Sequence, residues 1–187
     1  MILYLHGFAS SSGSAKVKSL QAFPDVTIVS FDLDVGPFKA IKQISSFIEE
    51  HIEKDIMLMG SSLGGYYALH ISAIFDLPAV LINPSMEPFK TLARFVDSRV
   101  QNYSKDESFI YKQQYVDELK TLVIDQANQK KILLMLQTGD ENLDYKTALH
   151  ALPQAQHLVQ EGGNHSFEHF DRNFSLIKTF YDKHFSD

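Results

Sequence analysis

Residues 56–67 read Ile-Met-Leu-Met-Gly-Ser-Ser-Leu-Gly-Gly-Tyr-Tyr, and this stretch decides the fold. The apolar run 56–59 predicts a buried strand, and G-x-S-x-G follows it directly, where a helix is expected to begin near Gly64. This context is typical of a nucleophile elbow, a sharp turn that presents a serine at the edge of a sheet. Side chains two residues before and after that serine would collide. Glycines at positions 60 and 64 therefore indicate Ser62, and not Ser61, as the nucleophile.

Short apolar runs and amphipathic stretches alternate along the rest of the chain. The other runs of strand length are 2–5, 26–31, 79–82, 132–136 and 157–159. Apolar residues recur at helical spacing over 38–52 and 170–185. Continuous apolar runs suit strands that are covered on both faces. The alternation predicts an α/β fold with a mostly parallel sheet of about six strands.

One segment, 85–130, is longer than a single crossover helix requires. It carries helix-like pieces at 89–100 and 111–124, which a polar break at 102–108 separates. A long excursion of this kind often covers a functional site. We expect a small helical cap embedded in a single domain, 1–187.

Composition excludes several classes of protein. With 187 residues, 44% hydrophobic and 21% charged, the chain suits one compact domain. The formal charge of −6 argues against nucleic acid or an anionic membrane surface as a partner. There is no cysteine, so a thiolate nucleophile is excluded. The charge-free run 56–75 has too many glycine and polar positions for a membrane span, and no basic leader opens the chain, so a cytoplasmic location is expected.

Candidate partners for the serine lie after the last two predicted strands. His165 follows strand 157–159 and the turn at Gly162 and Gly163, and it is the expected general base. Asp140 directly follows Gly139 at the carboxyl end of strand 132–136, where active sites of open sheets collect. It is the expected orienting acid. Asp144 and Glu141 are its rivals. The order Ser62, Asp140, His165 is the chain order of α/β-hydrolases.

An oxyanion site requires backbone amides close to the serine. The amide of Leu63, just after the nucleophile, and that of Phe8, in the loop after the first strand, are the expected donors. His6 is expected to brace this loop through hydrogen bonds. Phe8, Tyr66 and the insertion are expected to line the acyl site, with Tyr66 as a substrate-binding residue.

With these residues placed, the chain resembles the YqiA/YcfP family of small bacterial α/β-hydrolase esterases. The matching stretches include Leu-Tyr-Leu-His-Gly-Phe at 3–8, the elbow with its helix at 60–68, Gln-Thr-Gly-Asp-Glu at 137–141 and Glu-Gly-Gly-Asn-His at 161–165. The resemblance implies a three-layer α/β-hydrolase core with strands in the order 2-1-3-4-5-6. It places the triad on Ser62, Asp140 and His165. It also implies a serine esterase without a cofactor, acting on small-molecule acyl esters or thioesters of short acids.

Two other readings compete with the esterase. The chain could be a catalytically inactive ligand-binding protein on a hydrolase scaffold, because fold does not ensure activity. His165-x-x-Glu168-His169 also fits an inverted zincin pattern, which requires both histidines on one helix face. Gly162, Gly163 and Asn164 argue against that helix, and no metal ligand is expected. The sequence leaves acyl-chain length and oligomeric state open.

Overall fold

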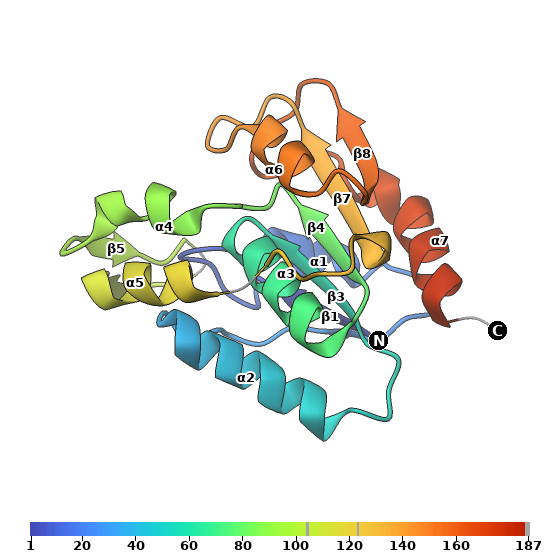
Figure 1. The fold of residues 1–187 in the computed structure, drawn as a ribbon, viewed down its shortest axis with the longest axis horizontal. Coiled ribbons are helices and arrows are strands. Elements are labelled where there is room, and N and C mark those ends of the chain that lie inside the picture. Colours follow the sequence, from blue (N-terminus) through green and yellow to red (C-terminus); the bar gives the residue numbers. More distant parts are fainter. Residues whose placement is uncertain (104, 123, 186–187) are drawn as a thin grey trace.

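The central feature is a six-stranded parallel sheet, seen in the computed structural model of residues 1–103, 105–122 and 124–185 (Figure 1). Its strands are β1 (Ile2–Leu5), β2 (Ile28–Val29), β3 (Met57–Ser61), β4 (Ala79–Ile82), β7 (Ile132–Gln137) and β8 (Gln156–Gln160). They lie in the order β2-β1-β3-β4-β7-β8 and every neighbouring pair is parallel. The predicted sheet and strand order are confirmed. β2 is shorter than the predicted run 26–31.

Helices cover both faces of this sheet. Helices α1 (Ala15–Leu20) and α7 (Phe174–Phe185), the latter preceded by the 3-10 turn η3 (Phe170–Asn173), lie on one face, and α2 (Pro37–Glu50), α3 (Leu63–Phe75) and α6 (Tyr145–Ala151) lie on the other. Successive strand residues point to opposite faces. Leu3 and Leu5 accordingly pack in one apolar cluster, and Ile2 and Tyr4 in the other. The result is the expected three-layer α/β arrangement.

The insertion between β4 and β7 is only partly helical. It contains α4 (Pro88–Thr91), the 3-10 turn η1 (Ala93–Phe95), strands β5 (Arg99–Gln101) and β6 (Ser108–Ile110), α5 (Gln113–Thr121) and the 3-10 turn η2 (Gln129–Lys131). The two strands form an antiparallel pair. The predicted helix-like piece 89–100 is therefore wrong in its second half. Asp97 has φ of 60°, which ends the helical turns, and its amide donates to Tyr111 in line with the β5–β6 pair.

The insertion shares its core with the sheet. Val100, Tyr111 and Leu119 are buried in the same cluster as Leu3 and Leu5. Ser104 and Val123, which fall within the predicted cap, lie outside the described residues.

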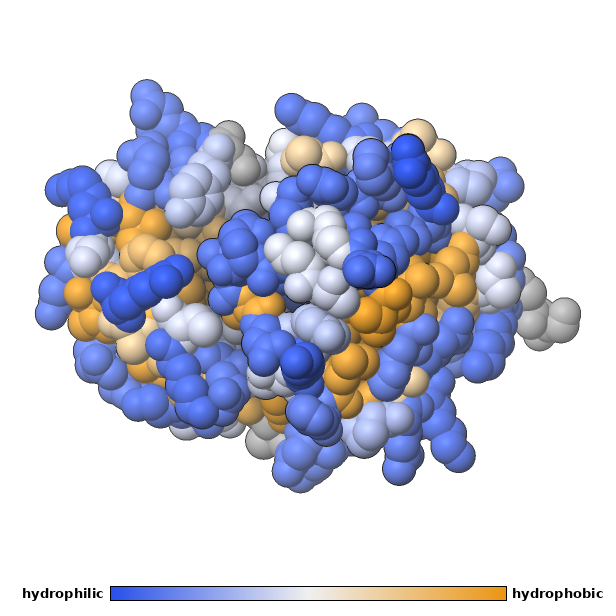
Figure 2. All heavy atoms as spheres, turned by 90° about the horizontal axis from the view of Figure 1, so that it is seen from above, coloured by the Kyte–Doolittle hydropathy of each residue, from blue (hydrophilic) through white to orange (hydrophobic). Residues whose placement is uncertain are grey.

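Hydrophilic side chains cover most of the face shown in Figure 2, and hydrophobic residues are visible between them. Across the described ranges, no helix combines the length and the apolar character that a bilayer crossing requires. The run 56–75 is instead divided between β3, the elbow and α3.

Candidate active site

The elbow between β3 and α3 holds Ser62 in a backbone conformation that is rare for residues with a side chain, with φ of 55° and ψ of −121°. A Cβ at Gly60 would lie 2.2 Å from the carbonyl oxygen of Gly64. One at Gly64 would lie 2.1 Å from the carbonyl oxygen of Leu5. Both positions therefore require glycine: Gly60 is crowded within the elbow, as predicted, and Gly64 is crowded by β1. The hydroxyl of the neighbouring Ser61 is hydrogen-bonded to the Tyr4 hydroxyl at 2.9 Å.

Three side chains from distant parts of the chain meet at this turn. Nε2 of His165 lies 3.0 Å from Oγ of Ser62. Nδ1 of the same ring lies 2.8 Å from Oδ2 of Asp140 and 3.0 Å from Oδ1. The structure thus brings together Ser62, His165 and Asp140 in the arrangement of a nucleophile, a base and an orienting acid.

Asp140 is held as a carboxylate although its side chain is only 2% exposed. Burial opposes its ionisation, but hydrogen bonds from His165 and from the amides of Asn142 and Leu143 outweigh burial and lower its pKa. An ionised Asp140 accepts the Nδ1 proton of His165. The other ring nitrogen is then left free to accept a proton from Ser62.

The two rival acids have different surroundings. Asp144 is the N-cap of α6, where its Oδ1 accepts the amide of Lys146 at 3.0 Å. Glu141 accepts the backbone amide of His165 at 2.9 Å, and this bond lowers the pKa of its carboxyl. The structure therefore places Asp140 alone of the three against the imidazole. Glu141 instead holds the main chain that carries the ring.

Two buried side chains that sequence reasoning missed hold the His165 loop. Asn83, directly after β4, donates from Nδ2 to the carbonyls of Asn164 at 3.0 Å and His165 at 3.3 Å. Its Oδ1 accepts the amide of Gln137 at 2.9 Å. Oε1 of Gln137 accepts the amides of Asn164 at 3.1 Å and Glu168 at 2.8 Å. The sequence feature that could have pointed to these two residues is their position, because each is a polar residue at the carboxyl end of an apolar strand.

Glycine at position 163 makes this loop possible. Gly163 has φ of 70°, and a Cβ there would lie 2.1 Å from Oε1 of Gln137. The glycine turn before His165 therefore lies directly against the Gln137 side chain.

The loop after β1 lies beside the nucleophile. A Cβ at Gly7 would lie 3.3 Å from the Cβ of Ser62. In the described part of the chain, the amides of Phe8 and Leu63 donate to no other group, and both residues line the cavity that contains Ser62. The amide of Leu63 also opens α3, where the helix dipole favours negative charge. Both amides are therefore available to a ligand oxygen.

His6 braces this loop, as predicted. Its Nε2 accepts the amide of Leu33 at 3.0 Å, so its Nδ1 carries the proton and donates to the carbonyl of Gly7 at 2.9 Å. Burial lowers the pKa of His6, and the neutral ring suits this pair of bonds.

The cavity beside Ser62 has a volume of about 440 Å³. The insertion forms part of its wall through Pro88, Thr91, Leu92, Arg94, Phe95 and Tyr103. Lys16 also lines this cavity and donates from Nζ to the carbonyl of Ser166, next to His165. Burial lowers the pKa of Lys16 to about 8. The cavity is thus mixed in character, with apolar and cationic side chains around the serine.

Residues 1–182 match the family described as the uncharacterised protein family UPF0227. The chain belongs to this family. It is 27% identical to the UPF0227 protein YcfP of Salmonella gallinarum, over 96% of this chain and 98% of the relative. The predicted resemblance to the YqiA/YcfP family is confirmed.

Solved structures show the fold of this UPF0227 protein to be that of the α/β-hydrolases. Est1E from Butyrivibrio proteoclasticus, solved with ferulic acid bound, superposes with a TM-score of 0.79 at 16% identity, covering 100% of this chain and 89% of that one. Mouse alpha/beta hydrolase domain-containing protein 10 gives a TM-score of 0.74 at 17% identity, covering 97% and 89%. Paleococcus ferrophilus monoacylglycerol lipase gives 0.71 at 16% identity, covering 97% and 93%.

Tyr66, predicted to bind substrate, lies instead in the core. It is 2% exposed, and its hydroxyl donates to the carbonyls of Leu119 at 3.0 Å and Leu122 at 3.3 Å. It thereby ties α3 to the end of α5, and it is absent from the lining of the cavity beside Ser62. One step along a helix turns a side chain by about 100°. The next residue, Tyr67, reaches a different cavity.

The inverted zincin pattern requires a helix, and residues 164–169 do not form one. Residues 164–169 form turns and loop, and His169 has φ of 55°. Oε1 of Glu168 accepts a hydrogen bond from Nδ2 of Asn164 at 2.8 Å. Within the ranges that the structure describes, no three acidic or histidine side chains come together as a metal site.

Proposed function

We propose that this UPF0227 protein is a serine hydrolase that cleaves carboxylic esters or thioesters of short acids through an acyl-enzyme. The observation that carries the proposal is the continuous chain from Ser62 Oγ to His165 Nε2 at 3.0 Å and from His165 Nδ1 to Asp140 at 2.8 Å. Ser62 and His165 line a cavity that is large enough for a small substrate.

His165 takes the proton of Ser62 as Oγ attacks the acyl carbon. The tetrahedral oxyanion rests on the amides of Leu63 and Phe8, and the loss of one such donor costs about 3 to 4 kcal/mol of transition-state stabilisation. The imidazolium then protonates the leaving oxygen or sulfur. Water, activated by the same imidazole, releases the acid from Ser62. Asp140 holds the tautomer and stabilises the imidazolium.

Two features support an active enzyme over an inactive binding protein. First, the expected base, the orienting acid and two free backbone amides all lie around Ser62. Second, the backbone of Ser62 has a strained φ, and the position holds a serine although a glycine would relieve that strain. Est1E, with ferulic acid bound, and a monoacylglycerol lipase share the fold, which agrees with ester hydrolysis. Every step of this mechanism uses only side chains, backbone amides and water, so it needs no cofactor.

Labelling with a fluorophosphonate, followed by peptide mapping, tests the proposal without knowledge of the substrate. We expect the label on Ser62. We also expect Ser62→Ala to lower kcat for p-nitrophenyl acetate and butyrate by about 10⁶, to the background rate. Ser61→Ala is the matched control, because Ser61 bonds to Tyr4 and lies one residue away. An unlabelled native protein, or turnover that survives Ser62→Ala, would overturn the proposal.

A further inference from the structure

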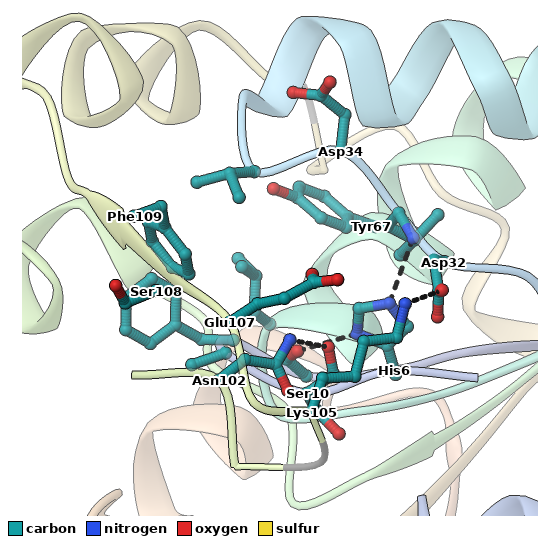
Figure 3. Close-up of a pocket in the computed structure, with 16 residues that line it drawn as sticks. His6, Ser10, Asp32, Asp34, Tyr67, Asn102, Lys105, Glu107, Ser108 and Phe109 are labelled. Atoms are coloured by element: carbon teal, nitrogen blue, oxygen red, sulfur yellow. Dashed lines mark hydrogen bonds and ion pairs between the residues drawn. The ribbon is translucent and has the colours of Figure 1, made fainter. Parts of the chain in front are cut away.

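A second cavity, of about 190 Å³, adjoins the one that contains Ser62 (Figure 3). Gly7, Phe8, Ser10 and Leu63 line both cavities, so the loop after β1 and the first residue of α3 form a wall that the two share. His165 lines the first cavity and not the second. A substrate bound at Ser62 would therefore reach the second cavity past the four residues that line both.

The second cavity has both apolar and charged walls, and the carboxylates of Asp34 and Glu107 are among the charged groups that line it. Apolar walls come from Phe8, Leu33, Val35, Leu63 and Phe109. At the rim, Lys105 forms an ion pair with Asp32, and Asn102 donates to the carbonyl of Ser10 at 3.0 Å. These bonds fasten the β5–β6 hairpin across the cavity.

Tyr67 places a hydroxyl in this cavity. The residue is 2% exposed and lines the second cavity, where Figure 3 shows its hydroxyl pointing into the pocket on the side of Phe109. Within the described ranges no hydrogen bond joins this hydroxyl to the protein, and it is not among the side-chain atoms that are sealed from water without a partner. Its oxygen is therefore open to water or to a ligand that enters the cavity. Burial also raises the pKa of Tyr67 well above its usual value, so the hydroxyl keeps its proton and can donate.

We propose that the second cavity receives the acyl group of the substrate and favours a ring-sized acyl group whose polar substituent hydrogen-bonds to the Tyr67 hydroxyl. This inference rests on the ester hydrolysis proposed above. It adds the substrate class, namely esters of hydroxyl-substituted aryl or cyclic acids.

Proton transfer assigns the acyl group, and not the alcohol, to this cavity. The leaving oxygen takes its proton from Nε2 of His165, so the alcohol has to stay within hydrogen-bond reach of that ring. Neither His165 nor Ser62 lines the second cavity, and no residue next to His165 lines it. The tetrahedral oxyanion, in contrast, is expected at the amides of Leu63 and Phe8, and these two residues line both cavities.

The volume matches a ring. An engineered apolar cavity of about 150 Å³ is known to hold benzene. A cavity of about 190 Å³ therefore accommodates a six-membered ring with one small substituent. A long unbranched acyl chain would exceed it.

Three p-nitrophenyl esters with the same leaving group test the proposal: the acetate, the 3-phenylpropanoate and the 3-(4-hydroxyphenyl)propanoate. For the native enzyme we expect kcat/KM for the hydroxyphenyl ester to exceed that for the phenyl ester by about three- to tenfold, the contribution of one hydrogen bond. Tyr67→Phe should bring this ratio close to one. Tyr66→Phe, a neighbouring change of the same size in the core, should lower thermal stability and keep the ratio.

A second variant, Val35→Phe, tests whether the size of the second cavity determines which acyl group is preferred. Val35→Phe narrows the second cavity and should shift the preference from the phenyl ester toward the acetate by about tenfold or more, as loss of a ring-sized site requires. The Tyr67 hydroxyl makes no hydrogen bond to the described residues of the protein, so Tyr67→Phe removes none. The midpoint of thermal unfolding of this variant should equal or exceed that of the native protein.

The outcomes separate this inference from the proposed function. If Ser62-dependent turnover of the acetate is present and neither Tyr67→Phe nor Val35→Phe changes the ratios, the acyl site lies elsewhere and the inference is wrong. If no ester is turned over and Ser62 takes no fluorophosphonate, the proposed function itself fails, and the inference fails with it.

Discussion

The side-chain amide of Asn83 donates to the main-chain carbonyl of His165 at 3.3 Å, across 82 residues of sequence. Asn83 follows β4 with φ of 40°, and its Oδ1 accepts the amide of Gln137 at the end of β7. One buried side chain thus links two strands of the rigid sheet to the loop that carries the proposed base. Asn83 is therefore a positioning residue for His165, with no contact to the reacting atoms required.

Replacement of Asn83 by alanine should misplace His165. We expect Asn83→Ala to lower kcat for p-nitrophenyl acetate by about 10- to 100-fold while KM changes by less than about twofold. The unpaired amide of Gln137 should also cost about 1 to 3 kcal/mol of unfolding free energy. Steady-state kinetics and urea denaturation measure both effects.

Ser72→Ala is the matched control for Asn83. The Ser72 hydroxyl is buried and donates to the carbonyl of Leu77 at 2.6 Å, at the far end of α3. The Ser72→Ala variant should lose a comparable amount of unfolding free energy, and its kcat should be unchanged. Equal loss of kcat in both variants would show that Asn83 acts only through general stability.

The identity of the orienting acid can be tested with two isosteric changes. Asp140→Asn should lower kcat by about 10⁴, because the amide favours the wrong tautomer of His165. Asp144→Asn should have little effect, because asparagine also caps helices well. Kinetics with the same ester on both variants decides the matter. The reverse order of effects would move the acid to Asp144.

The strained backbone at Ser62 should be visible in stability. Ser62→Gly should be more stable than Ser62→Ala by about 1 to 3 kcal/mol, because glycine adopts a φ of 55° without steric cost. Within helix α3, Ser72→Gly should be less stable than Ser72→Ala by about 1 kcal/mol. Urea denaturation of the four variants provides the comparison. The same sign at both positions would contradict strain at the elbow.

The ion pair at the rim of the second cavity should contribute stability that depends on pH. The hydrogen bond from Lys105, with bonds from the amide and hydroxyl of Ser12, lowers the pKa of Asp32 to about 2. A lowered carboxyl pKa stabilises the fold above the unfolded value, near 3.9, and this contribution disappears as the pH falls toward 2.

The unfolding free energy of the native protein, minus that of Asp32→Asn, should be constant from pH 7 to about 5 and should shrink between about pH 4 and 2. The total change should not exceed about 1 kcal/mol, because the Asp32 side chain is 44% exposed and solvent screens the pair. Lys105→Met should flatten the same profile. A difference that grows as the pH falls would contradict the assignment.

Much of the site followed from local chemistry. The glycines at 60 and 64 selected Ser62 because a Cβ at either position meets backbone atoms, those of Gly64 and Gly65 within the elbow for Gly60 and those of Leu5 and His6 after β1 for Gly64. The apolar runs predicted the six strands, and the resemblance to a hydrolase family supplied their order. His165 and Asp140 followed from their positions after the last two strands.

Other features depended on contacts that no local pattern encodes. The choice of Asp140 over Asp144 depended on which carboxylate the β7 turn aims at His165 and which one caps α6. Likewise Tyr66 and Tyr67 are adjacent, identical residues, and only the packing of α5 and the hairpin against α3 decides that one hydroxyl is bonded and the other faces a cavity.

The sequence by itself determined the sheet, the elbow and the residue types available for catalysis, because steric limits and apolar periodicity act over a few neighbouring residues. The tertiary structure alone decided the Asn83 and Gln137 bonds, the hairpin over 99–110 and the second cavity. The strands of the hairpin pair locally, but its attachment to the loop after β1 and the bonds of Asn83 and Gln137 join residues tens of positions apart, so they form only after the sheet has brought the segments together.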